Sequence, residues 1–404
     1  MQNKLRVIVG GVIGLYSTGG ATWDYLQFPL GLKLMGHDVY YIEDTMRYPH
    51  NANKKKWDEH SWTDATECIE YLKRSMAIFD LSDRWAYRDY GSGKCFGMSL
   101  KKVKDLCKTA DVFINISASS VLRDEYLKIP SRIFIDSDPM FTQIQSLIPP
   151  LHKIKNSMKE MVEAHNHLFS FGENIGNRNC RIPTLDKNWL PLRQPICLDY
   201  WENGTGKTKF SFTSVMNWNE QKQLMFANEA WGQKDVEFQK FLGLPAFFPN
   251  IKFEIVINPP VDRKHPTQRK SKFDKSRVQA SGWRVLNPKK YIATSEEYKK
   301  FIQHSYAEFS VAKETYVKSN SGWFSCRSAC YLAAGKPVVT QDTGWSNFIP
   351  SGQGLFAFTN LQTAKDAIEE VTGNYKQHTK AAKDIAREYF DSSKVLSQLL
   401  CNIN

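Results

Sequence analysis

Three polar residues open a short segment that we expect to be a helix ending at Gly335. Ser325 and Ser328 offer hydroxyl groups, and Arg327 offers a guanidinium. The first backbone N–H groups of a helix have no partner inside the helix, and the helix dipole favours negative charge at that end. Together these groups could bind a diphosphate.

A polar loop follows the next predicted strand, residues 337–340. It consists of Gln341, Asp342, Thr343 and Gly344. In open parallel sheets, ligands lie outside the carboxyl ends of the strands. Short polar side chains at such a place suit the hydroxyl groups of a sugar.

The elements that would hold these residues form two α/β series. Residues 4–11 predict a strand, residues 21–35 a helix and residues 37–42 a second strand, a unit typical of the start of a Rossmann-like parallel sheet. Further short apolar runs predict buried strands at residues 110–116, 132–135 and 167–171. After a break rich in Pro and Gly at residues 186–210, a second series predicts strands at residues 210–216, 253–257, 308–311, 337–340 and 355–358.

The composition excludes several classes of protein. The 404 residues are 42% hydrophobic and 24% charged, a balance typical of globular domains. No apolar run approaches the roughly 18 residues that a membrane span needs. The eight cysteines lack CxxC pairs and metal-ligand spacing, which argues against structural zinc and indicates a cytoplasmic protein with reduced thiols.

The positive charge is concentrated in one segment. The formal net charge is +12, and residues 263–300 hold 12 basic and 3 acidic side chains, a net of +9. A concentrated positive field attracts phosphate groups and other polyanions, but lysine-rich loops also serve only to keep proteins soluble. Both interpretations stay open.

The segment 333–344 (AAGKPVVTQDTG), with its preceding helix and the GQGL turn after it, resembles the donor domain of GT-B glycosyltransferases. The whole chain is also similar to a group of bacterial glycosyltransferases, in segments such as WDYLQ, GHDVYYIED, FGENIG and GQKD. The resemblance implies an α/β protein of the GT-B fold, with two Rossmann-like domains facing a central cleft. We expect these domains at residues 1–195 and 208–385, and a C-terminal helix at residues 386–404 that crosses back to the first domain.

The resemblance also implies donor-binding residues. Asn217 stands at the end of the strand that opens the second domain, and Lys234 begins the next helix, where GT-B enzymes grip the donor diphosphate. Lys313 and Arg327 would be the other cationic contacts. The paired glutamates of retaining enzymes would fall at Gly322 and Cys330, which are not acidic, so the stereochemistry stays open. We expect a UDP-linked sugar as the co-substrate, no cofactor and no metal.

A base near the acceptor is needed to take the proton of its hydroxyl. Asp24 opens the first helix after the glycine loop, although an acidic residue there also suits the helix dipole. Asp136 and Asp138 follow a buried strand, so Asp138 is a second candidate for the base. The same DSD motif could instead be the metal-binding DxD of the GT-A fold.

The acceptor is expected to lie against the first domain. Gly20, Trp23 and Glu173 are candidate contacts there, and Arg269 and Lys270 of the basic segment would extend the surface. A basic surface suits DNA, so a phage-type glycosyltransferase that modifies a 5-hydroxymethylated base is an alternative. A non-catalytic sugar- or nucleotide-binding protein and a nucleotide-sugar epimerase are further alternatives.

Overall fold

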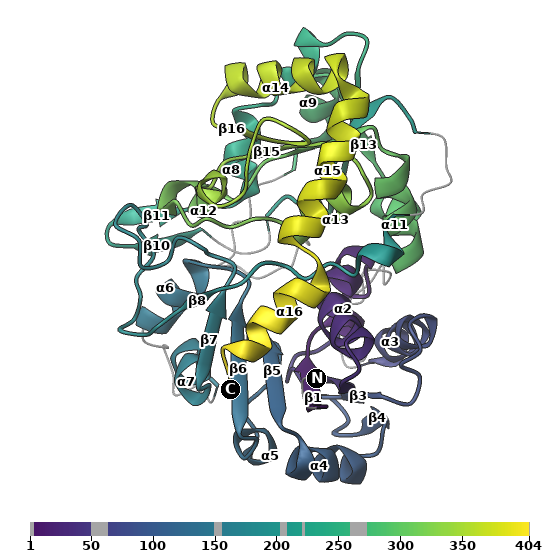
Figure 1. Cartoon of the computed structure of the whole chain (residues 1–404), viewed down its shortest axis with the longest axis vertical. Helices are drawn as coiled ribbons and strands as arrows, with labels where there is room; N and C mark the ends of the chain where they lie inside the picture. Colours follow the sequence, from purple (N-terminus) through teal and green to yellow (C-terminus); the bar gives the residue numbers. More distant parts are fainter. Residues whose placement is uncertain are drawn as a thin grey trace.

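The computed structural model describes residues 4–49, 64–148, 156–202, 208–219, 223–258 and 273–403. The predicted acceptor contacts Arg269 and Lys270 lie outside these residues. Two α/β domains lie one above the other along the long axis, and both ends of the chain are in the lower one (Figure 1).

An eight-stranded sheet forms the N-terminal domain, in the order β4–β3–β2–β1–β5–β6–β7–β8. The pairing is parallel except between β3 and β4. The strands are β1 (Arg6–Gly10), β2 (Asp38–Glu43), β3 (Trp85–Arg88), β4 (Cys95–Gly97), β5 (Val112–Ile116), β6 (Ser131–Asp136), β7 (His167–Ser170) and β8 (Leu190–Pro191).

Helices bury both faces of this sheet, which explains why its strands read as continuous apolar runs. Val7 and Val9 of β1 pack in one core cluster with Phe28 of α2, whereas Ile8 packs in another with Val103 of α4. The helices are α1 (Ile13–Tyr16), α2 (Gly19–Leu34), α3 (Thr66–Ile78), α4 (Leu100–Thr109), α5 (Asp124–Leu127), α6 (Phe141–Leu147) and α7 (Met158–Ala164).

A parallel six-stranded sheet forms the second domain, in the order β13–β12–β9–β14–β15–β16. Its strands are β9 (Ser211–Asn217), β12 (Lys252–Asn258), β13 (Trp283–Leu286), β14 (Ala307–Ser310), β15 (Val338–Gln341) and β16 (Leu355–Phe358). The hairpin β10 (Leu224–Phe226) and β11 (Glu229–Trp231) lies outside it. Its helices include α8 (Lys234–Gln239), α9 (Lys275–Ala280), α10 (Pro288–Tyr291), α11 (Ser295–His304), α12 (Glu314–Ser319), α13 (Cys326–Ala333) and α14 (Leu361–Gly373).

The C-terminal segment forms two helices, and the predicted crossing helix at residues 386–404 begins only at Ser392. α15 (Tyr375–Tyr389) lies on the second domain, and α16 (Ser392–Cys401) lies against α2 of the first (Figure 1). The chain bends between them, where Ile196 accepts a backbone hydrogen bond from Ser392 and donates one to Phe390. Apolar residues of α16, among them Leu396, then join the core cluster of the first sheet.

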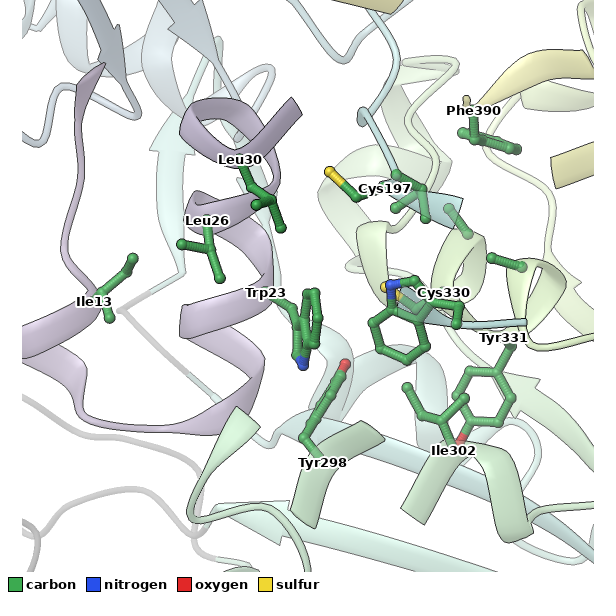
Figure 2. Close-up of a cluster of buried hydrophobic side chains, with 14 of the residues drawn as sticks. Ile13, Trp23, Leu26, Leu30, Cys197, Tyr298, Ile302, Cys330, Tyr331 and Phe390 are labelled. Atoms are coloured by element: carbon green, nitrogen blue, oxygen red, sulfur yellow. The ribbon is translucent and has the colours of Figure 1, made fainter. Parts of the chain in front are cut away.

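One hydrophobic core continues across the two domains. Trp23, Leu26 and Leu30 of α2 face Ile302 of α11 and Tyr331 of α13 in the same buried cluster (Figure 2). The two domains are therefore joined on this side by packed side chains as well as by the chain itself.

Candidate active site between the domains

The carboxyl ends of the two sheets meet at an ion pair between the domains. Lys313, just after β14, places its Nζ 2.9 and 3.1 Å from the two carboxylate oxygens of Asp138, just after β6. The Tyr316 hydroxyl also donates to Asp138. The centres of the Phe141 and Tyr316 rings lie 5.1 and 5.3 Å from the Lys313 ammonium. The Lys313 side chain is 9% exposed. Thus a predicted cation and a predicted base, far apart in the sequence, are brought together.

The neighbouring acid of the DSD motif has a structural role. Asp136 is fully buried and accepts hydrogen bonds from the side chains of Thr142, Gln143 and Ser170, which tie the loop after β6 to β7. Burial raises its pKa. Among the described residues, no group of three or more His, Cys, Asp or Glu side chains is arranged to hold a metal ion.

The start of α8 is tied to the start of α12. Glu314 donates its backbone N–H to the carbonyl of Gln233 at 3.3 Å and accepts one from Gly232 at 2.8 Å through its carboxylate. Lys234 follows Gln233, and Lys313 precedes Glu314, so these bonds bring the two predicted diphosphate-binding lysines to the same end of the sheet. Asn217 ends β9 at this edge.

The predicted role of Arg327 as a phosphate contact does not fit its placement. Its Nε donates to Glu308 at 2.5 Å, its Nη1 donates to the carbonyl of Val215 at 2.6 Å, and its Nη2 donates to the Ser310 hydroxyl. Glu308 is fully buried, and the ion pair raises the pKa of Arg327 despite burial. The guanidinium therefore joins α13 to β9 and β14 beneath the site.

The two predicted serines of α13 differ in position. Ser325 immediately precedes the helix, so its hydroxyl lies at the helix start, and the residue is 8% exposed. Ser328 is fully buried, and its hydroxyl has no hydrogen-bond partner. Of the two predicted serines, Ser325 therefore lies at the start of the helix and Ser328 lies inside the protein.

The polar loop after β15 uses its side chains within the protein. Gln341 binds Glu237 at 2.6 Å and the backbone N–H of Ala312 at 3.1 Å. Asp342 accepts hydrogen bonds from residues 344 and 346, and the Thr343 hydroxyl donates to the carbonyl of Trp323 at 2.6 Å. The three side chains predicted to bind a sugar are therefore engaged with other parts of the protein in this structure.

Gly344 lies where the loop touches the first domain. Its φ is +93°, and an added Cβ would lie 2.1 Å from Asn320 and 2.4 Å from Asn174. Asn174 crosses to the second domain, donating its backbone N–H to the carbonyl of Ser321 and its side-chain amide to that of Asn320. The sequence reasoning missed Asn174, although it lies next to a predicted contact in the GENIG segment.

That predicted acceptor contact, Glu173, is engaged elsewhere. Its two carboxylate oxygens each lie 2.8 Å from the guanidinium of Arg193 in the same domain, and its side chain is 7% exposed. Glu173 thus ties the loop after β7 to the segment after β8 through Arg193.

Trp23, another predicted acceptor contact, lies in the core that the two domains share. It is 2% exposed, donates its Nε1 hydrogen to the carbonyl of Ser295 in the other domain at 2.9 Å, and packs against Trp201. A tryptophan just after a glycine loop can contact a ligand or pack between two domains, so the sequence alone does not distinguish these two roles of Trp23.

The glycine loop itself contacts the second domain. Gly19 donates its backbone N–H to Ile292, and a Cβ there would lie 2.2 Å from the carbonyl of Thr294. Gly20 faces the Tyr298 ring, 3.4 Å from the position of an added Cβ. Both glycines therefore allow close contact between the domains.

Asp24, the other predicted base, is exposed on α2 and faces the start of α13. The pKa of the Cys326 thiol, the first residue of that helix, is raised by its hydrogen bond with Cys330, by burial and, more weakly, by the Asp24 carboxylate. Asp24 and Asp138 thus approach the second domain at two different places.

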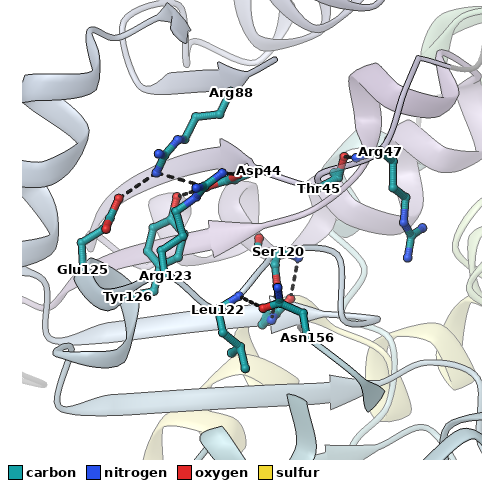
Figure 3. Close-up of polar contacts among 11 residues, drawn as sticks. Asp44, Thr45, Arg47, Arg88, Ser120, Leu122, Arg123, Glu125, Tyr126 and Asn156 are labelled. Carbon is teal, nitrogen blue, oxygen red and sulfur yellow. Dashed lines mark hydrogen bonds and ion pairs between the residues drawn. The ribbon is translucent and has the colours of Figure 1, made fainter. Parts of the chain in front are cut away.

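The loops after β2 and β5 of the first domain are held by a second ion-pair network (Figure 3). Asp44, after β2, accepts two hydrogen bonds from Arg123 at 2.6 and 2.7 Å, and Arg88 lies 3.2 Å away. Arg47 is exposed and points away from this network (Figure 3).

Comparisons with known proteins establish the fold. No protein-family model and no curated protein matches this sequence. Solved structures do match along the whole chain. An alpha-glucosyltransferase in complex with UDP and a 13-mer DNA has a TM-score of 0.57 at 11% identity, with 100% of each chain covered.

Two other structures are similar to a comparable degree. The sucrose-phosphate synthase from Thermosynechococcus elongatus has a TM-score of 0.53 at 11% identity, with 99% of each chain covered. HepE from Anabaena, in complex with UDP and glucose, has a TM-score of 0.53 at 10% identity, also with 99% of each chain covered. This fold contradicts the GT-A alternative. The chain has the GT-B fold, with a C-terminal helix that returns to the first domain, as the sequence predicts.

Proposed function

We propose that the protein transfers a sugar from a nucleotide-sugar donor, UDP-linked in the first instance, to an acceptor hydroxyl. The observation that carries this proposal is the meeting of Lys313, Asp138 and the start of α8 with Lys234 at the carboxyl ends of both sheets. Ligands of parallel sheets lie at this edge, and two lysines there would stabilise a leaving diphosphate.

The proposed reaction uses one base and two cations. As the bond between the sugar C1 and the diphosphate oxygen breaks, Lys234 and Lys313 stabilise the leaving nucleoside diphosphate. The acceptor oxygen bonds to C1, and its proton passes to the carboxylate of Asp138 or Asp24. Because the two lysines supply positive charge, we expect transfer to persist in EDTA.

Two further observations bear on the setting of the reaction. All eight cysteines are free thiols, which suits the reducing cytoplasm that we propose as its compartment. Within the described ranges, no helix combines the length and apolar character that a membrane span requires.

The test is a screen of nucleotide sugars for loss of the sugar, with EDTA present and absent. We expect at least one donor to release its nucleoside diphosphate, measured with a coupled assay. Asp138→Asn and Asp24→Asn then identify the base, because the variant that lacks the base loses kcat. Conversion of the donor to its epimer would indicate an epimerase instead. Binding without turnover, with every acceptor class offered, would indicate a binding protein.

DNA is a second candidate acceptor, favoured by charge at the domain interface. Lys289 and Lys290 of α10 are exposed, and the end of this helix leads to Ile292, which accepts a backbone hydrogen bond from Gly19 of the first domain. Two cations therefore lie beside the glycine loop of the acceptor domain, within the basic segment 263–300. Cations at that place would contact phosphates of a nucleic acid.

Transfer to duplex DNA containing 5-hydroxymethylcytosine, measured across a salt series, tests this candidate. We expect Lys289→Gln/Lys290→Gln to weaken DNA binding and to flatten its salt dependence, because each lost phosphate contact lowers the slope by about one unit. Lys101→Gln/Lys102→Gln, on the exposed face of α4, is the matched control. Absence of transfer at low salt with any donor that the enzyme hydrolyses would exclude DNA.

A further inference from the structure

One cation serves two partners in the proposed reaction. Lys313 is needed by the leaving diphosphate, yet its ammonium lies 2.9 and 3.1 Å from the two oxygens of Asp138. Only 9% of the lysine side chain is exposed, whereas 32% of the aspartate side chain is. The ammonium is therefore enclosed between its acidic partner and the rings of Phe141 and Tyr316.

The same pair also occupies the proposed base. Asp138 accepts hydrogen bonds from Lys313 through both oxygens and a further one from the Tyr316 hydroxyl. A carboxylate that already accepts three hydrogen bonds from two donor groups is poorly placed to accept the proton of an acceptor hydroxyl. In this arrangement neither residue is ready for the role that the reaction gives it.

We propose that the donor diphosphate and Asp138 compete for Lys313, so that donor binding frees Asp138 to act as the base. This inference rests on the proposed function. On donor binding, the ammonium turns from the carboxylate to the diphosphate, which carries more negative charge. Tyr316 keeps its hydrogen bond to Asp138 and fixes the orientation of the released carboxylate, which makes Tyr316 a positioning residue.

The surroundings fit such an exchange. Asp138 is bound at its loop by the buried Asp136, which accepts its backbone N–H at 3.1 Å, so the carboxylate stays in place when the lysine leaves. Lys313 immediately precedes α12, whose start is tied to the start of α8 and hence to Lys234. A short movement of the lysine side chain would therefore keep it within the group of proposed diphosphate contacts.

The competition has a measurable consequence. Removing the charge of Asp138 should strengthen diphosphate binding, because the ligand no longer displaces an ion pair. Coupling between two binding events typically changes affinity by about 5- to 150-fold. We therefore expect Asp138→Asn to bind UDP at least about fivefold more tightly than the wild type while losing transfer activity.

The experiment is calorimetric titration of the full-length protein with UDP, repeated with GDP, ADP and dTDP. The variants are Asp138→Asn, Lys313→Met and the double variant, with Asp105→Asn on α4 as a control for the same change in net charge far from the interface. Lys313→Met should weaken UDP binding, and Asp138→Asn should give no gain in the Lys313→Met background. Tyr316→Phe should lower kcat at saturating donor and leave UDP affinity unchanged.

The possible outcomes distinguish a failure of the proposed competition from a failure of the proposed function. If no nucleoside diphosphate binds the wild type, the proposed function fails. The competition is overturned if UDP binds the wild type and Asp138→Asn does not bind it more tightly. It is also overturned if Asp138→Asn raises the UDP affinity as much in the Lys313→Met background as in the wild type. In both cases the proposed function stands. Equal gains for Asp138→Asn and Asp105→Asn would also overturn it, because they would reflect net charge alone.

Discussion

Arg327 and Glu308 form a buried ion pair, with 2.5 Å between the guanidinium Nε and the carboxylate Oε1, beneath the site at the carboxyl ends of the second sheet. Arg327 is 8% exposed, and Glu308 is fully buried. The arginine also binds β9 through Val215 and β14 through Ser310. One side chain of α13 thus fixes the helix to two strands of the sheet.

Removal of this arginine should destabilise the second domain strongly. Arg327→Met leaves Glu308 buried without its cation, and the loss of one partner of a buried pair costs about 3 to 5 kcal/mol. Urea unfolding followed by tryptophan fluorescence measures the change in free energy of unfolding. The double variant Arg327→Met/Glu308→Gln should recover part of the loss. No recovery would show that the arginine acts through packing rather than through its charge.

The sequence predicted the helix of Arg327 but not the direction of its side chain. The short apolar runs and glycine positions predict two α/β series, because strands buried on both faces read as continuous apolar runs. The GT-B arrangement of those two series came from the resemblance of segments such as 333–344, and the strand order comes from the structure. An arginine at the start of a helix reads equally well as a phosphate contact and as the partner of a buried acid. Only the position of Glu308, 19 residues earlier, decides between them.

Interdomain contacts were the other feature that the sequence left undetermined. Trp23 and Glu173 were predicted to contact the acceptor, and each is instead engaged inside the protein. Lys313 and Asp138 were assigned separate roles from separate motifs. Their pairing depends on how the two domains are oriented, and a local sequence pattern does not predict that orientation.

Trp23 should couple the unfolding of the two domains. Trp23→Ala removes a large buried side chain from the core that the domains share, at a cost of about 3 to 5 kcal/mol. We expect the variant to unfold in two calorimetric steps that are further apart than in the wild type. Trp189→Ala, which removes a tryptophan buried within the first domain alone, is the control. A similar separation in both variants would contradict a special role for Trp23.

Lys234 should contribute to donor affinity as a cation at the leaving group. We expect Lys234→Met to weaken UDP binding by about tenfold or more, because charge-assisted hydrogen bonds contribute about 1.5 to 3 kcal/mol. Lys252→Met is the matched control, since Lys252 lies at the amino end of β12, opposite Ser211 and at the far edge from Asn217. Equal losses in the two variants, measured by calorimetry at one ionic strength, would contradict a local role.

Glu43 is fully buried against the glycine loop of the first domain. Its carboxylate accepts the backbone N–H groups of Gly14 and Leu15 at 2.9 and 2.6 Å, and burial raises its pKa to about 7. In the unfolded chain the group titrates near the ordinary value of 4.5. The folded protein therefore binds this proton more tightly than the unfolded chain does.

The stabilisation from Glu43 is fully present below pH 4.5 and is lost as the pH rises to about 7, by about 3 kcal/mol in all. Glu43→Gln should remove this fall from the pH dependence of urea unfolding between those two values. A curve as steep in Glu43→Gln as in the wild type would assign the pH dependence to other groups.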